Sequence, residues 1–92
     1  MNITVEYSAQ IKRAAGTARE TVEVAEDATI RDVLIAVCEG REEAFRRLVL
    51  TAESDPQPTL LIFAGDEQVR GVAAQPLADG TIVTLLSPIS GG

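Results

Sequence analysis

The sequence predicts an α+β domain in which a mixed sheet of about five strands packs on one main helix. Two alternating segments open the chain, a strongly amphipathic helical segment follows them, and further strand-like runs fill the second half. The chain has 92 residues and shows no internal repeat, so residues 1–92 are predicted to form a single domain.

The first segment has the alternation of a half-buried strand. Ile3, Val5 and Tyr7 are separated by polar residues, and this period of two is typical of a strand with one covered face. Residues 21–25 alternate in the same way. A turn is predicted at residues 14–17, so the two segments are expected to form an N-terminal hairpin.

The main helix is predicted to begin at Thr29, because Asp32 follows three residues later in a capping-box arrangement. Gly40 is a plausible end. The apolar residues between them recur at helical spacing and define one face: Ile30, Val33, Leu34, Val37 and Cys38. Cys38 is therefore predicted to be a buried core thiol rather than a reactive one. A second, shorter helical pattern covers residues 41–50, through Ala44, Phe45, Leu48 and Val49.

The second half reads as strands joined by short connections. Residues 53–58 are predicted to be a loop, and the continuous apolar run 60–64 suits a central strand covered on both sides. Residues 69–72 are expected to form a short edge strand. Asp79–Gly80 signals a tight turn before a last strand at residues 81–86. A mixed sheet that grips one helix in this order is a β-grasp, or ubiquitin-like, architecture.

Composition excludes several classes of function. The sequence contains no histidine, so neither a Ser-His-Asp nor a Cys-His catalytic arrangement can be built. Cys38 is the only cysteine, which rules out an internal disulfide or a thiolate metal cluster and fits a cytoplasmic protein. The net charge of −6 argues against a nucleic-acid partner. It fits docking on basic partner surfaces, and equally a generic acidic protein. No signal segment or membrane span is expected.

Two glycines end the chain. Gly91 and Gly92 follow the apolar run 82–86 and a bend at Ser87 and Pro88. Because glycine has no Cβ, such an end can enter a narrow channel, where a second enzyme can reach the terminal carboxylate. The sequence therefore predicts a tail, at about residues 88–92, that presents a reactive chain end.

The chain resembles the MoaD/ThiS family of small ubiquitin-like sulfur carriers, and most closely its MoaD-type members. The C-terminal stretch PLADGTIVTLLSPISGG, from Pro76 to Gly92, is similar to the family's Asp-Gly turn, apolar strand, proline and terminal Gly-Gly. The stretch YSAQIKRAAG, from Tyr7 to Gly16, is similar to the family's aromatic, basic and Ala-Gly run after the first strand. Many members carry an Asn near the turn after the apolar run 60–64, where this chain has Ala64, Gly65 and Asp66. This departure from the family pattern leaves the sulfur pathway open.

The resemblance implies a definite chemistry for the tail. A MoeB/ThiF-like activating enzyme would use ATP to adenylate the Gly92 carboxylate, and a sulfur donor would then displace AMP to leave a thiocarboxylate. In a MoaD role, a MoaE-like large subunit of molybdopterin synthase would receive the sulfur. The carrier would be a non-catalytic small subunit with no bound cofactor. Gly91 would remove bulk, and Pro88, Ile89 and Ser90 would form an extended arm.

Docking is expected to involve the last strand. Val83 and Leu85 point one way, so Ile82 and Leu86 point the other way and would form an exposed apolar patch beside the tail. The alternative is that both faces are covered within the domain. Arg70, near the predicted edge strand, is a further candidate that could pair with a partner carboxylate. The alternative for Arg70 is a solvated charge without a partner.

Three other functions stay open. The chain could carry sulfur for thiamine thiazole, cysteine or tRNA thiolation. It could also be a protein modifier whose Gly92 ends as an isopeptide to lysine. The last alternative is a non-reactive β-grasp binding module, for which loss of Gly92 would change nothing.

Overall fold

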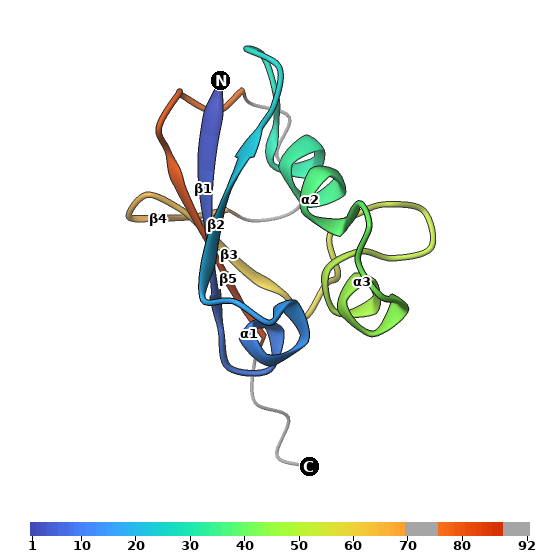
Figure 1. The fold of residues 1–92 in the computed structure, drawn as a ribbon. Helices are drawn as coiled ribbons and strands as arrows, with labels where there is room; N and C mark the ends of the chain where they lie inside the picture. The colour runs from blue at the N-terminus through green and yellow to red at the C-terminus, as the bar shows by residue number, and fades with distance from the viewer. Residues whose placement is uncertain (70–75, 88–92) are drawn as a thin grey trace.

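A five-stranded sheet carries the fold, and helices cover one of its faces (Figure 1). The computed structural model describes residues 1–69 and 76–87. Within those ranges the elements are, in chain order, β1 (Asn2–Ser8), α1 (Ala9–Ala15), β2 (Arg19–Glu23), α2 (Ile30–Cys38), α3 (Glu43–Val49), β3 (Leu61–Ala64), β4 (Glu67–Val69) and β5 (Ile82–Leu86).

The strands are arranged in the order β2-β1-β5-β3-β4. The two central strands, β1 and β5, run parallel, and the other neighbouring pairs are antiparallel. The sheet is therefore mixed, and the predicted β-grasp architecture is confirmed. β4 lies at an edge, as predicted, but its described part is Glu67–Val69, and residues 70–72 of the predicted strand lie outside the described residues.

The connection between β1 and β2 differs from the prediction. The two strands pair antiparallel as expected, but residues 9–15 form helix α1 rather than a simple turn. Ile11 is the only residue that α1 buries, so the segment has no amphipathic period to detect. The turn lies at residues 16–18, between α1 and β2. Gly16 ends the helix with a left-handed backbone, and its N–H donates to the Lys12 carbonyl. β2 begins at Arg19, two positions before the predicted residue 21.

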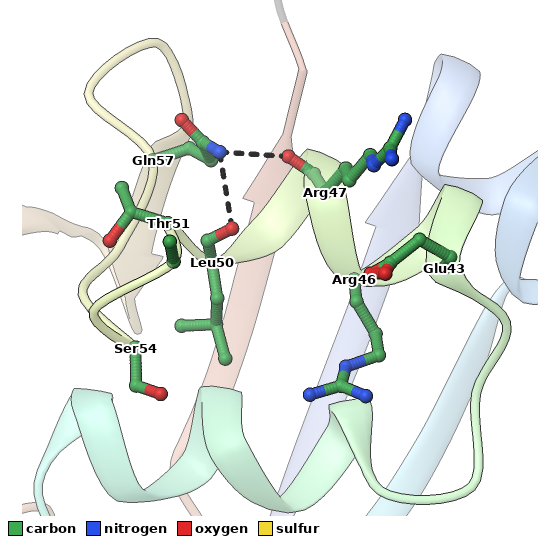
Figure 2. Close-up of a pocket in the computed structure, with 8 residues that line it drawn as sticks. Glu43, Arg46, Arg47, Leu50, Thr51, Ser54 and Gln57 are labelled. Carbon is green, nitrogen blue, oxygen red and sulfur yellow. Dashed lines mark hydrogen bonds between the residues drawn. The ribbon is translucent and has the colours of Figure 1, made fainter.

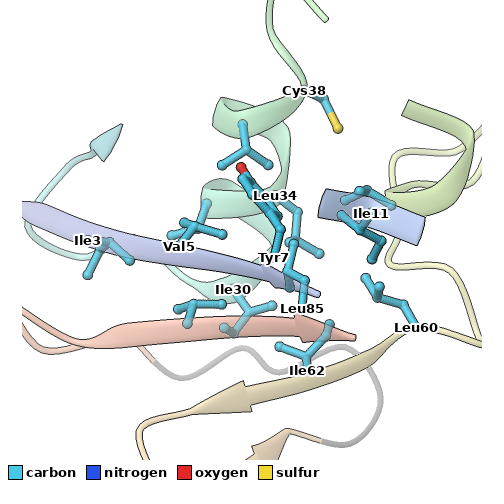
Figure 3. Close-up of a cluster of buried hydrophobic side chains, with 14 of the residues drawn as sticks. Ile3, Val5, Tyr7, Ile11, Ile30, Leu34, Cys38, Leu60, Ile62 and Leu85 are labelled. Carbon is cyan, nitrogen blue, oxygen red and sulfur yellow. The ribbon is translucent and has the colours of Figure 1, made fainter. Parts of the chain in front are cut away.

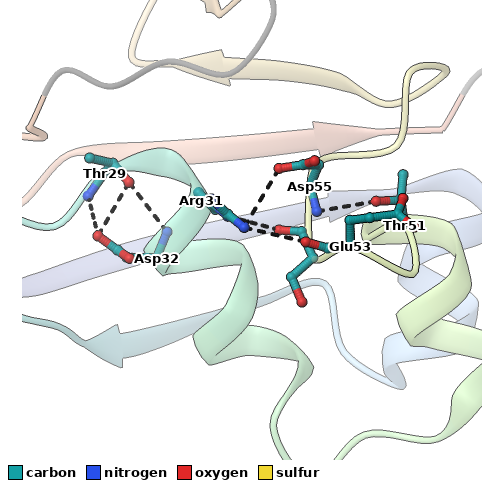
Figure 4. Close-up of polar contacts among 7 residues, drawn as sticks. Thr29, Arg31, Asp32, Thr51, Glu53 and Asp55 are labelled. Atoms are coloured by element: carbon teal, nitrogen blue, oxygen red, sulfur yellow. Dashed lines mark hydrogen bonds and ion pairs between the residues drawn. The ribbon is translucent and has the colours of Figure 1, made fainter.

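Helix α2 packs on the covered face and contributes more residues to the core cluster than any other element (Figure 3). The capping box is present: Thr29 Oγ1 accepts from the Asp32 N–H, and the Thr29 N–H donates to Asp32 Oδ2 at 3.0 Å (Figure 4). The predicted apolar face is buried, and it meets Ile3, Val5 and Tyr7 of β1. Aliphatic burial between one helix and the sheet thus holds the domain together.

Helix α3 falls inside its predicted range. Phe45 and Val49 are buried, whereas Ala44 is exposed, because the helix turns only one narrow face inward. Gln57 Nε2 closes the end of the helix by donating to the Arg47 carbonyl at 2.9 Å and to the Leu50 carbonyl at 3.1 Å (Figure 2).

The predicted loop after α3 is present, and α2 holds it in place. Arg31 Nε donates to the Ser54 carbonyl at 3.0 Å, and its guanidinium lies 3.7 Å from the Asp55 carboxylate (Figure 4). None of the helices within the described ranges has the length and apolar composition needed to cross a bilayer.

Candidate functional site at the end of strand β5

The chain leaves the sheet at the end of β5. Leu86 pairs with Ser8 of β1 on one side and with Leu61 of β3 on the other, so the last residue of β5 is held between two neighbours. Ser87 is the last described residue. The predicted tail residues Pro88, Ile89, Ser90, Gly91 and Gly92 lie outside the described residues, as does Arg70. What the structure describes is the root of the tail.

The two faces of β5 divide as predicted. Val83 and Leu85 are fully buried against the helices. Ile82 is 41% exposed on the opposite face, and Leu86, also on that face, is partly exposed. The alternative, in which the domain covers both faces, is wrong for the described part of the chain. Ile82 and Leu86 therefore lie on an open face of the sheet beside the tail root.

Strand β3 adds two residues to this open face that the sequence did not reveal. The prediction that its apolar run is covered on both sides is wrong, because α1, α2 and α3 cover only one face of the sheet (Figure 1). Leu61 is 36% exposed and lies directly opposite Leu86. Phe63 lies opposite Thr84, which places it diagonally from both Ile82 and Leu86.

These four side chains, Leu61, Phe63, Ile82 and Leu86, make up the open-face patch. The half-buried Thr84 lies among them, on the same face and directly opposite Phe63. The neighbouring strands β1 and β2 are polar on the same face, where Arg19 and Glu6 form an ion pair at 2.7 Å. A contiguous apolar area with a polar border commonly marks a protein interface. The open-face patch is therefore the best candidate docking surface among the described residues.

A polar network on the covered side fixes α1 to the sheet. The Tyr7 hydroxyl donates to Glu20 Oε2 at 2.5 Å, and the Arg41 guanidinium donates to the same carboxylate oxygen and to the Ala15 carbonyl. The guanidinium also lies over the Phe45 ring, 4.9 Å from its centre. Burial, together with the hydrogen bond to Glu20, raises the pKa of the Tyr7 hydroxyl. The network is built for structure, since each polar group in it has a partner.

The one thiol is not a nucleophile. Cys38 is 4% exposed, and burial raises its pKa to about 11. The thiol is therefore protonated at neutral pH and out of reach of a substrate. Within the described ranges, no three His, Cys, Asp or Glu side chains are grouped so that they could hold a metal ion.

The family model for the ThiS family matches residues 5–92. The chain belongs to the ThiS family. The match includes the terminal Gly91 and Gly92 as well as the last four strands and the second half of β1. The resemblance read from the sequence is thus confirmed, and the chain is a ubiquitin-like member of the MoaD/ThiS sulfur carriers.

Solved structures agree with this ThiS-family fold. SAMP1 from Haloferax volcanii is 23% identical, with 100% of both chains covered and a TM-score of 0.86. A putative molybdopterin converting factor, subunit 1, from Pyrococcus furiosus is 24% identical over 97% of this chain and 99% of that one, with a TM-score of 0.75.

A third similar chain belongs to the BexX/CysO complex of Amycolatopsis orientalis. It is 26% identical over 98% of this chain and 99% of that one, with a TM-score of 0.69. No curated protein sequence matches this ThiS-family chain.

Proposed function

We propose that this ThiS-family chain is a sulfur carrier whose Gly92 carboxylate is adenylated and then converted to a thiocarboxylate. The observation that carries the proposal is the family match, which extends to the last residue and so includes the Gly-Gly end. The open-face patch beside the tail root supports it, because a carrier must dock on the enzyme that activates its tail.

The chemistry needs an activating enzyme rather than a catalytic site in this chain. A carboxylate is a poor electrophile, and ATP converts it into an acyl-adenylate as pyrophosphate leaves. A sulfur nucleophile then attacks the acyl carbon, a C–S bond forms, and the C–O bond to AMP breaks. The carrier supplies the carboxylate and binds no cofactor, while ATP belongs to the activating enzyme.

Each part of the chain has a separate role in this scheme. Gly92 supplies the reacting carbon, and Gly91 removes side-chain bulk where the tail enters the partner. Pro88, Ile89 and Ser90 form the arm, while Arg70 pairs with a carboxylate of the partner. The open-face patch contributes apolar burial to docking.

Molybdopterin synthesis is the pathway that we propose for the sulfur. The C-terminal sequence from Pro76 to Gly92 has the MoaD-type pattern, and the similar Pyrococcus furiosus chain is described as a putative molybdopterin converting factor. In this role the chain is the small subunit of molybdopterin synthase, and a MoaE-like large subunit holds the pterin that receives the sulfur. Carriers for thiazole, cysteine or tRNA thiolation would have the same tail chemistry with a different acceptor.

Protein modification is the second candidate, and a specific observation favours it. SAMP1 matches this chain over its full length with a TM-score of 0.86, and the name stands for small archaeal modifier protein 1. In that role Gly92 would end as an isopeptide to a lysine of another protein. Adducts of high mass that survive reductant, and that disappear when Gly92 is deleted, would identify it.

ATP–pyrophosphate exchange tests the carrier role. The full chain is expected to stimulate exchange by a MoeB/ThiF-like activating enzyme, and the chain without Gly92 is expected to give none. Addition of a MoaE-like subunit and its pterin should then yield molybdopterin only from thiocarboxylated carrier. Equal exchange with and without Gly92 would contradict the proposal, and exchange without product would redirect it to another acceptor.

A further inference from the structure

Helix α1 lies next to the root of the tail. Ser8 pairs with Leu86, and α1 begins at the next residue, Ala9. The helix therefore lies at the end of the sheet where the chain leaves β5 (Figure 1). The α1 surface consists of Lys12 and Arg13 together with the open hollow that they line beside Gly16, Thr17 and Ala18.

This surface is basic in an otherwise acidic protein. Residues 7–19 contain three cations and no carboxylate, although the whole chain has a net charge of −6. Lys12 and Arg13 are exposed, and within the described ranges neither has an ion pair or a hydrogen bond from its side chain. Their charges are therefore available to a partner.

The other end of the sheet, where β1 and β5 begin, carries charge of the opposite sign. The strand ends and turns there hold six exposed carboxylates: Glu23, Glu26, Asp27, Asp66, Glu67 and Asp79. The cation among them in the described ranges is the N-terminal ammonium of Met1, which donates to the Val24 carbonyl at 2.6 Å. The Asp79 carboxylate accepts from the Asn2 N–H at 2.8 Å, which places it at the start of β1. The tail thus leaves the protein beside Lys12 and Arg13 and away from these six carboxylates.

We propose that the α1 surface docks on a carboxylate-rich rim around the channel of the activating enzyme. Such a rim attracts Lys12 and Arg13 and repels the six carboxylates at the other end of the sheet. It therefore orients the approaching carrier so that the tail faces the enzyme. The net charge of −6 suggests a basic partner surface, but the charge beside the tail is positive and calls for an acidic one. This inference rests on the proposed sulfur-carrier function.

The α1 surface contacts the protein surface of the activating enzyme rather than its bound ATP. Six residues follow Leu86, and a chain of that length in the extended form that a narrow channel requires spans about 20 Å. Lys12 and Arg13 stay at the mouth of the channel while Gly92 reaches the ATP. Contacts at the mouth act on encounter, so they change kcat/KM for the carrier and leave kcat unchanged.

The test compares two charge reversals in the pyrophosphate-exchange assay. The variant K12E/R13E alters the α1 surface, and R46E/R47E is the matched control on α3, where both arginines line the separate cavity of Figure 2. Each lowers the net charge by four units. We expect K12E/R13E to lose about tenfold in kcat/KM with kcat unchanged, and the control to change by less than about twofold.

Salt and a milder variant complete the test. The difference between wild type and K12E/R13E should vanish as ionic strength rises to about 1 M, where the Debye length falls to about 3 Å. If charge reversal unfolds α1, K12Q/R13Q takes its place, because this variant removes the charges without reversing them. It should show about a threefold loss in kcat/KM and a weaker salt dependence than wild type. Equal losses in both reversals, or no loss in K12E/R13E, would overturn the inference and leave the carrier function intact. No exchange with wild type would overturn both.

Discussion

Replacement of Arg41 by alanine should destabilise the domain more than any other single charge removal on the described surface. The side chain of Arg41 is 22% exposed and that of its partner Glu20 is 28% exposed, so solvent screens their ion pair only partly. Three contacts disappear together: the charge-assisted bond to Glu20, the hydrogen bond to the Ala15 carbonyl, and the contact with the Phe45 ring.

The size of the loss follows from these contacts. A hydrogen bond between charged groups is worth about 1.5–3 kcal/mol, a bond to a neutral carbonyl about 1 kcal/mol, and a cation–π contact about 0.5–1 kcal/mol. Because they share one side chain and are not additive, we expect Arg41→Ala to lower the free energy of unfolding by about 3 kcal/mol. That is a large share of the roughly 5–15 kcal/mol typical of a domain.

Urea denaturation followed by circular dichroism measures the loss. Arg47→Ala is the matched control, because the Arg47 side chain is exposed and forms no ion pair within the described residues, and it should change stability by less than about 0.5 kcal/mol. A double-mutant cycle with Glu20→Gln should give a coupling energy of about 1 kcal/mol or more. A loss below about 1 kcal/mol for Arg41→Ala would refute this account of the network.

Three further predictions concern the cap, the thiol and the patch. Thr29→Ala should cost about 1 kcal/mol by denaturation, because it removes half of the capping box of α2, and an unchanged midpoint would contradict this. Cys38 should react with a thiol reagent at pH 8 only after unfolding. Because its pKa is raised from 9 to about 11, the unfolded thiol loses its proton first, so stability should fall as the pH rises through that window. Leu61→Ser should weaken binding of the activating enzyme at least about tenfold, whereas Ile35→Ser on the outer face of α2, with similar exposure of 37% against 36%, should not. Equal losses from the two would exclude the open-face patch as the interface.

Local signals in the sequence predicted the elements that local interactions determine. The capping box at Thr29 and Asp32 and the amphipathic period of α2 depend on residues within a few positions of each other, and both are found in the structure. Helix α1 escaped detection because one buried residue, Ile11, produces no period. Short helices stabilised by tertiary contacts rather than by their own pattern are hard to predict for this reason.

The candidate site was predicted only in part. Alternation on β5 identified Ile82 and Leu86, but the continuous apolar run of β3 could not reveal that one of its faces is open, since this depends on which side the helices pack. Phe63 and Leu61 were missed for that reason. The negative net charge gave no indication of the basic surface of α1. Only the topology shows that the carboxylates gather at the other end of the sheet. The roles of Arg70 and residues 88–92 stay predictions.

Intact-mass analysis after incubation with ATP, a MoeB/ThiF-like activating enzyme and a sulfur donor tests the central claim most directly. The account predicts a mass gain equal to exchange of one oxygen for one sulfur on the full chain, and no gain on a chain that lacks Gly92. An unchanged mass with several activating enzymes, each shown to thiocarboxylate its own carrier, would contradict sulfur loading at Gly92.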